Sequence, residues 1–260
     1  MGETAWRANI DGFEQAARSM VALADELTAA DWDRPTECPG WSVKDQYSHI
    51  LGIERWLLGD ADDGETRTSA NTELDVEARR ADPPGEILGD LRDVIERRVA
   101  VLRSGAVDLT EVVTTPFGPA MAYGDFMRHR AFDVWMHEQD VRRATGRPGN
   151  LDGPGADCSR LVLEGSLPYV VGKRAAAAPG QTVVVETPEH RWRVVVGDDR
   201  RARFHDGPDG DAEPTVRLRM AWETFVRLGG GRVTGDAADV EVGGDPELAR
   251  RVLAGMAVTP

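Results

Sequence analysis

The hydrophobic periodicity changes along this chain of 260 residues, and this change limits the folds that the chain can adopt. Over about 4–29, apolar side chains recur every three or four residues, which is the pattern of an amphipathic helix. Similar patterns predict further helices over about 43–58, 84–103 and 125–145. After about residue 150, the runs QTVVVET, HRWRVVVGD, RARFHDG and PTVRLRM alternate as strands do.

Capping residues support the predicted helix ends. Ser42 is a good N-cap residue, and Asp45 follows it three positions later. Pro84 suits the first turn of the third helix. Gly105 and Gly146 are placed to end the third and fourth helices. Four helices with a polar site between two of them indicate a four-helix bundle.

The second half reads as a helix at about 155–173, then strands, with TFVRLGGGRV and DPELARRVLAGM as helices beside a small sheet. Glycine and proline cluster in GRPGNLDGPG, so we place a domain boundary near Asn150. The predicted fold class is α+β, with a helical bundle over 1–149 and a small α+β domain over 150–260. We expect 60–83 to be a connection with one helical turn at most, and TTPFGPAMAYG to be a loop.

Charge and hydropathy exclude several classes of partner. The net charge is −14, and such a surface repels nucleic acids and anionic membranes, so we expect neither as a partner. The N-terminus lacks a signal pattern, and no apolar run approaches the ~18 residues that span a bilayer. We therefore expect a cytoplasmic protein. Cys38 and Cys158 lie in no CxxC motif, so a disulfide framework is not expected.

Asp133 and His137 form the most informative pair of polar residues. They lie four residues apart in HRAFDVWMHEQDVRRATGRP, so in a helix their side chains share one face, about 40° apart. His49 lies on another predicted helix. One oxygen and two nitrogen donors leave a coordination position open, which is typical of a catalytic divalent metal. The alternatives are an exposed ion pair at Asp133 and a buried His49 satisfied by a carbonyl or a single acid.

Other polar residues near these ligands have simpler readings. Arg130 and Asp140 flank the pair and either orient His137, bind a carboxylate or form a surface ion pair. We expect Glu54 to form an ion pair with Arg55 or a neighbouring helix. We expect Glu138 to be a surface charge and Cys38 to be a small buried residue.

Four segments carry a resemblance to a known family. CPGWSVKDQYSHILGIE and DVWMHEQDVRRATGRPG closely resemble the two signature segments of the mycothiol-dependent maleylpyruvate isomerase family of actinobacteria. That family belongs to the DinB-like superfamily of metal-binding four-helix bundles. PTVRLRMAWETFVRLGGGR and VEVGGDPELARRVL resemble its sterol-carrier-like C-terminal domain. The resemblance thus covers most of the chain and implies a DinB-like bundle followed by that domain.

The resemblance also implies a site. The family's metal ligands map onto His49, Asp133 and His137; the family commonly has Glu at the acid position, whereas this chain has the shorter Asp133. The implied cofactors are a divalent metal, most readily Zn²⁺, and mycothiol, the small thiol of actinobacteria. A functional arginine is implied in the second domain. We take Arg232 as the catalytic candidate, because the glycines before it permit a sharp turn; the alternative is a surface arginine after a helix.

The implied activity is that of a metal-dependent enzyme in which a mycothiol thiolate attacks an electrophilic small molecule. The outcome is isomerisation of the maleylpyruvate type or S-transfer. Two alternatives remain open: a metal-dependent hydrolase or transferase that uses no mycothiol, and a non-catalytic protein that binds a small molecule. The expected partners are mycothiol and the electrophile, and the expected assembly is a monomer or a homodimer.

Overall fold

The computed structural model divides into two compact units, Met1–Arg160 and Leu161–Pro260. The division lies within helix α6 (Pro154–Tyr169), whereas the domain boundary near Asn150 rests on the Gly/Pro cluster and stays a prediction. The structure describes residues 2–60, 69–115, 118–205 and 213–259.

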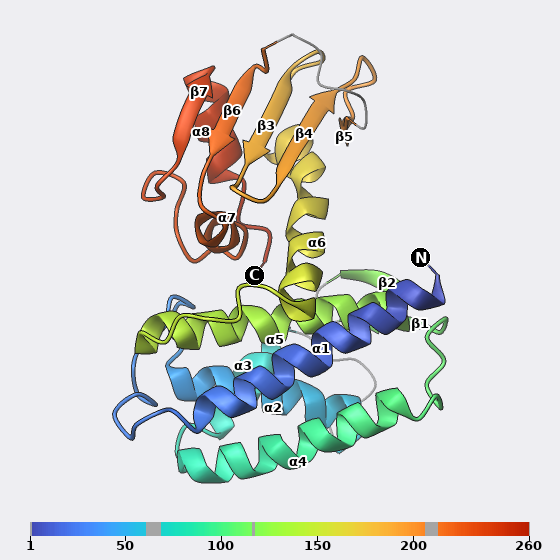
Figure 1. Cartoon of the computed structure of the whole chain (residues 1–260), viewed down its shortest axis with the longest axis vertical. Coiled ribbons are helices and arrows are strands. Elements are labelled where there is room, and N and C mark those ends of the chain that lie inside the picture. The colour runs from blue at the N-terminus through green and yellow to red at the C-terminus, as the bar shows by residue number, and fades with distance from the viewer. Residues whose placement is uncertain (1, 61–68, 116–117, 206–212, 260) are drawn as a thin grey trace. The chain divides into compact units, whose positions relative to one another are not determined.

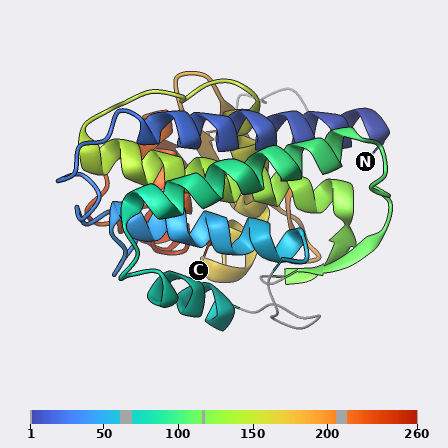
Figure 2. The same cartoon turned by 90° about the horizontal axis from the view of Figure 1, so that it is seen from below.

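Four long helices form the core of the N-terminal unit, as the periodicity predicts. Figure 2 shows them side by side, with α1 in blue and α5 in yellow-green, and the packed pairs are α1 with α5, α2 with α4, α1 with α4 and α2 with α5. Their bounds are α1 (Glu3–Ala24), α2 (Val43–Leu57), α4 (Pro84–Arg103) and α5 (Tyr123–Thr145). The large apolar side chains between them are almost wholly buried, and each contributes about 1.5–3 kcal/mol to folding; they include Phe13, Met20, Tyr47, Ile50, Leu91 and Trp135.

The predicted capping residues occupy the predicted positions. The Ser42 side chain accepts a hydrogen bond from the Asp45 backbone N–H, and the Asp45 carboxylate accepts one from the Ser42 N–H, so both sides of a capping box are formed. Gly146 ends α5 in the left-handed conformation at φ 67°, which a residue without a Cβ adopts at little cost. These local contacts orient α2 and α5, the two helices that carry the candidate ligands.

Two predicted connections are instead regular elements. Helix α3 (Ser69–Ala78) lies within the polar connection and packs on α2. A Cβ at Gly52 would lie 2.2 Å from the Asp75 carboxylate, so the missing side chain of Gly52 permits this approach. The second element is a hairpin, formed by β1 (Val112–Thr115) and β2 (Gly118–Ala122) in place of the predicted loop. The prediction of a loop is wrong here, because the β-branched run VVTT favours a strand and its pairing with β2 stabilises it.

The C-terminal unit is a five-stranded sheet with helices, in the order β5-β4-β3-β6-β7 (Figure 1). All neighbouring strands are antiparallel except β3 and β6. The strands are β3 (Thr182–Glu186), β4 (Arg191–Val196), β5 (Ala202–Phe204), β6 (Val216–Arg219) and β7 (Glu241–Gly244). The prediction omitted β7, a short edge strand whose two glycines hide its period.

The helices of this unit complete the α+β fold class that the sequence predicts. After α6 come a short π-helix (Val170–Arg174), α7 (Trp222–Gly229) and α8 (Pro246–Ala254). Helix α8 packs on β6 and β7 and buries Leu248 and Val252. Within the described ranges, no helix is both long and apolar enough to cross a membrane.

Candidate metal centre

The bundle brings together the three residues that the sequence singles out. His49 projects from α2, and Asp133 and His137 project from α5. One ligand atom of each lies within 4.8 Å of the others. His49 Nε2 lies 3.1 Å from Asp133 Oδ2, and His137 Nε2 lies 3.6 Å from Asp133 Oδ1. Both imidazoles are buried, whereas the Asp133 side chain is 29 % exposed.

The spacing of these atoms suits a small divalent ion. In a tetrahedral zinc site with bonds of about 2.0–2.1 Å, neighbouring ligand atoms lie about 3.3 Å apart. The two distances from the Asp133 carboxylate to the imidazole nitrogens lie on either side of that value. The donor set of two neutral imidazoles and one carboxylate is also typical of catalytic zinc, which keeps a further position open.

Hydrogen bonds leave one side of the His49 ring unused. Nε2 faces Asp133, while Nδ1 is buried and has no hydrogen-bond partner among the described residues. Burial lowers the pKa of His49 to about 4, an effect that the nearby Asp133 only partly offsets. The ring is therefore neutral at pH 7, which is the form that binds a metal. The residues present thus fit a divalent metal ion.

Asp133 is held ionised by its surroundings. Burial alone would raise the pKa of this carboxyl, but His49 and Arg130 together hold it well below the usual range. Arg130 donates from Nη1 to Asp133 Oδ2 at 2.8 Å. Since Arg130 is itself 1 % exposed, it fixes one carboxylate oxygen from the protein interior and leaves the other directed toward His137.

Behind Arg130 lies a buried charge network centred on Glu54. Arg130 donates to Glu54 Oε1 at 2.7 Å, and Arg98 donates to Glu54 Oε2 at 2.9 Å. Arg98 also donates to the Tyr123 hydroxyl at 2.9 Å. The prediction that Glu54 pairs with a neighbouring helix is therefore confirmed. The network connects α2, α4 and α5 and supports Asp133 through Arg130.

Two charged residues are buried: Glu138, which was expected as a surface charge, and Asp140, for which a surface ion pair was one of the alternatives. Glu138 is 0 % exposed and accepts hydrogen bonds from Ser19 and Arg142. Asp140 is also 0 % exposed, and its Oδ1 accepts from Arg143 at 2.7 Å, so this ion pair is an interior one. The prediction of a surface charge at Glu138 is wrong, and so is the surface alternative for Asp140, because most side chains of α5 are buried, which a single helical pattern does not reveal.

Three residues beside the ligands were missed or undervalued. Trp41 packs on both imidazoles, with ring centroids 4.9 Å from His49 and 5.6 Å from His137. Gln46 Oε1 is hydrogen-bonded to His137 Nδ1. Cys38 forms a second potential donor group with His137 and Asp140. Gln46 could have been found from its position three residues before His49 on the same helix face; the Cys38 contact depends on the fold.

Arg232 lies where the sequence places it, directly after the glycine-rich turn that follows α7. Gly231 has φ 68°, and Arg232 Nη1 donates to the Gly230 carbonyl at 2.7 Å. The guanidinium thus satisfies a carbonyl at the end of α7. The catalytic role of Arg232 stays a prediction.

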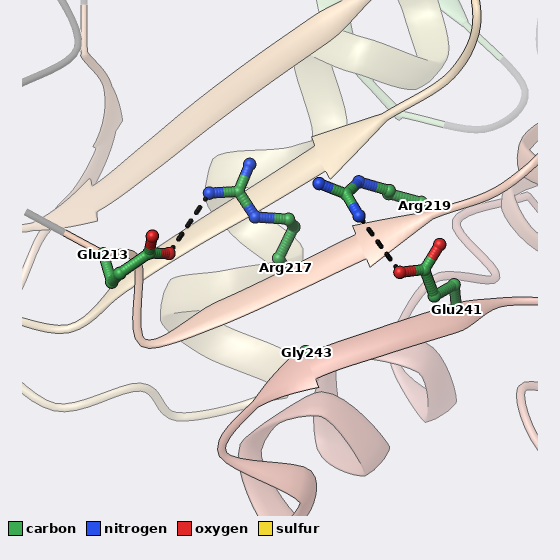
Figure 3. Close-up of a pocket in the computed structure, with 5 residues that line it drawn as sticks. All are labelled: Glu213, Arg217, Arg219, Glu241 and Gly243. Atoms are coloured by element: carbon green, nitrogen blue, oxygen red, sulfur yellow. Dashed lines mark hydrogen bonds and ion pairs between the residues drawn. The ribbon is translucent and has the colours of Figure 1, made fainter. Parts of the chain in front are cut away.

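The C-terminal sheet carries a polar pocket of its own. Figure 3 shows Arg217 paired with Glu213 and Arg219 paired with Glu241. The pocket that these residues line has a volume of about 340 Å³. Each arginine that lines this pocket therefore has a carboxylate partner. The pocket contains no group of three potential metal ligands, and both such groups among the described residues lie in the N-terminal unit.

Comparison with known proteins identifies the family. The model of the mycothiol maleylpyruvate isomerase N-terminal domain matches residues 13–142, and the C-terminal domain model of the same family matches 157–251. The chain belongs to the mycothiol maleylpyruvate isomerase family. The matched regions include all three candidate ligands in the first domain and Arg232 in the second.

Individual relatives add the following. Two uncharacterized proteins of Mycobacterium tuberculosis, from strains CDC 1551 and H37Rv, are each 29 % identical over 135 residues. The match spans 48 % of this chain and about half the length (51 %) of each relative. Crystal structures of the mycothiol-dependent maleylpyruvate isomerase and of a histidine-to-alanine mutant cover 93 % of this chain and 95 % of theirs, with TM-scores of 0.60 and 0.58. At 13 % identity these structures establish the shared fold.

Proposed function

We propose that this protein is a metal-dependent enzyme that uses mycothiol as its thiol cofactor. The observation that carries the proposal is the convergence of His49, Asp133 and His137 in one buried group with zinc-like spacing. Family membership and the family's name supply the choice of thiol. The proposed reaction is isomerisation of the maleylpyruvate type or S-transfer to an electrophilic small molecule.

In this proposal His49, Asp133 and His137 hold the ion, most readily Zn²⁺. A bound Zn²⁺ favours the thiolate form of a neighbouring thiol, which makes its sulfur nucleophilic at neutral pH. Asp133 is ready to bind without losing a proton, because its pKa already lies well below the usual range. Arg130 keeps that carboxylate in place, and buried Trp41 shields the two imidazoles from solvent.

Arg232 completes the proposal as the residue that would bind an anionic group of the substrate. Its guanidinium is a fixed positive charge with several donors, which suits a carboxylate. An Arg232→Lys variant should then raise KM for an anionic substrate and leave metal content unchanged. A lower metal content in this variant, with an unchanged KM, would mean instead that Arg232 stabilises the fold and does not bind the substrate.

Metal analysis followed by calorimetry tests the proposal. We expect about one divalent ion per chain and saturable binding of mycothiol that disappears when the ion is removed by a chelator. Glutathione should bind far more weakly, because a tripeptide cannot reproduce contacts to mycothiol's sugar and inositol groups. Binding of the metal without mycothiol would favour a hydrolase or another transferase. Binding of neither would favour a non-catalytic small-molecule-binding protein.

A further inference from the structure

His137 is shared by two groups of potential ligands, one on each ring nitrogen. Its Nε2 lies 3.6 Å from Asp133 Oδ1, on the side of His49. Its Nδ1 lies 3.7 Å from Asp140 Oδ2, in the group that includes Cys38. A neutral imidazole has one N–H and one nitrogen lone pair. Which group can use His137 as a ligand therefore depends on which nitrogen carries the proton.

A chain of hydrogen bonds determines which ring nitrogen of His137 carries the proton. The chain starts at a backbone carbonyl, which can only accept a hydrogen bond. The Trp41 backbone carbonyl accepts from the Thr36 hydroxyl at 2.9 Å. The single proton of that hydroxyl is thereby used, so Thr36 Oγ1 accepts from Gln46 Nε2 at 2.7 Å. The amide nitrogen of Gln46 therefore faces Thr36, and its carbonyl oxygen faces His137 Nδ1.

The amide oxygen of Gln46 has no proton to give, so His137 Nδ1 must be the donor in this contact. Asp140 adds to the preference, because its carboxylate, already paired with Arg143, faces the same nitrogen. Gln46 is 0 % exposed and His137 is 6 % exposed. Solvent therefore has little access to the contact between Gln46 and His137, and leaving the Gln46 amide oxygen unpaired here would cost free energy.

We infer that Gln46 is a positioning residue that holds His137 as the Nδ1–H tautomer and so presents its Nε2 lone pair to His49 and Asp133. The inference rests on the proposed function only for its consequence at the metal. In this arrangement the Nδ1 side of the ring, near Cys38, is held by a hydrogen bond, and the Nε2 side, near Asp133, is the one that can bind a metal. Hydrogen bonds to the second nitrogen of a ligating histidine commonly have this effect in metal sites.

Nitrogen-15 NMR of the metal-free protein tests the tautomer directly. At about pH 8 an ordinary imidazole is neutral, and the two ring nitrogens of His137 then give distinct shifts for N–H and lone pair. We expect the Nδ1–H form in the native protein and in Gln46→Glu, whose carboxylate also accepts. Gln46→Leu should give a mixture of the two forms, and Thr36→Val a smaller shift in the same direction. A native ring in the Nε2–H form would overturn the inference.

Metal affinity provides the second readout. We expect Gln46→Leu to weaken divalent metal binding 10- to 100-fold, and Gln46→Glu to restore it to within a few-fold. Gln139→Leu is the matched control, because Gln139 is 2 % exposed on the same helix as His137 but donates to the Gly149 and Asn150 carbonyls. It should leave the affinity and the tautomer unchanged. Thermal unfolding checks that each variant is folded.

Two outcomes would contradict the inference at the metal. One is native affinity in a folded Gln46→Leu protein. The other is loss of affinity in Cys38→Ala without loss in Gln46→Leu, which would place the ion on the Nδ1 side. Failure of the proposed function would look different: without mycothiol binding both readouts still apply, and without metal binding the NMR measurement alone decides.

Discussion

Two glutamates of this protein each form ion pairs with more than one arginine. One glutamate lies inside the bundle and the other on the C-terminal sheet. Glu54 is 0 % exposed and is paired with Arg98 and Arg130, which are 1 % exposed. Glu186 is 17 % exposed and accepts from three arginines at 2.8 Å, and their side chains are 23–50 % exposed; they are Arg191, Arg217 and Arg219. The distances in the two clusters are alike, so the surroundings make the difference.

In the bundle, each charge has lost its water and depends on its partners, because a low dielectric strengthens attraction and makes an unpaired ion costly. On the sheet, water and salt screen the same contacts, and exposed ion pairs contribute little. The number of arginines around a carboxylate is thus a poor guide to its importance. Burial distinguishes the network around Glu54, which supports the candidate metal centre, from the exposed network around Glu186 on the sheet surface.

The largest expected effect is that of Glu54→Gln. This change leaves Arg98 and Arg130 with a neutral partner in a buried site, so the free energy of unfolding of the N-terminal unit should fall by about 3–5 kcal/mol. Urea denaturation followed by circular dichroism measures it. A loss under about 1 kcal/mol would mean that the buried network behaves like the exposed one, and the comparison would fail.

The second effect concerns the histidines of the two units. His49→Ala or His137→Ala removes one of the three proposed protein ligands, so the metal Kd should rise at least ~100-fold, equivalent to about 2.7 kcal/mol. His205→Ala is the control, since His205 is exposed on the C-terminal unit. Elemental analysis after dialysis measures the metal content. Full occupancy in both bundle variants would exclude the proposed ligand set.

The third effect is on the pH dependence of stability in the metal-free protein. His49 has a pKa of about 4 when folded and about 6.5 when unfolded, so between these values the unfolded state binds more protons. The contribution of His49 to stability should therefore fall as pH falls, by about 2 kcal/mol from pH 7 to 5. Asp133, whose pKa is lowered, contributes stability above about pH 4 and loses it only below that.

Urea titrations at several pH values test the third prediction, and His49→Leu should reduce the slope of the curve between pH 7 and 5. A smaller slope should remain in this variant, because burial lowers the pKa of His129 to about 4 as well. Equal slopes in the native protein and in His49→Leu would show that His49 is not buried as a neutral ring.

The smallest effect is expected for Glu186→Gln. The three arginines around it keep their access to water, so the free energy of unfolding of the C-terminal unit should change by less than about 1 kcal/mol. This change in the free energy of unfolding should be smaller still in about 0.5 M salt, because salt screens the interactions between exposed charges. A loss as large as that of Glu54→Gln would contradict the contrast drawn between the two clusters.

Local patterns predicted much of the fold. The predicted helix over 84–103 matches α4 residue for residue, and α5 begins two residues before its predicted start. Both helices have a strong apolar period and clear end signals. Helix α3 and the β1–β2 hairpin were missed, because their polar or glycine-containing sequences depend on packing against the bundle and on strand pairing rather than on period.

The site was predicted in the same uneven way. The spacing of Asp133 and His137 is a property of one helix, so it could be read directly. The convergence of His49 required the resemblance, because a helical pattern gives the angle of a side chain but not the neighbour that it meets. The pairing of Arg98 with Glu54 links residues 44 positions apart, and only the packing of α4 on α2 brings it about.

Trp41 has a spectroscopic consequence. Its indole ring lies about 5 Å from both imidazoles, with centroid distances of 4.9 and 5.6 Å. An ion with visible absorption, such as Cu²⁺ or Co²⁺, would quench indole fluorescence at this range, whereas the filled d shell of Zn²⁺ gives no such absorption. The protein has seven tryptophans, so the difference between the native emission and that of Trp41→Phe isolates the signal. The packing of one aromatic ring thus provides an internal optical probe of whether an added ion binds at the candidate metal centre, and of which kind.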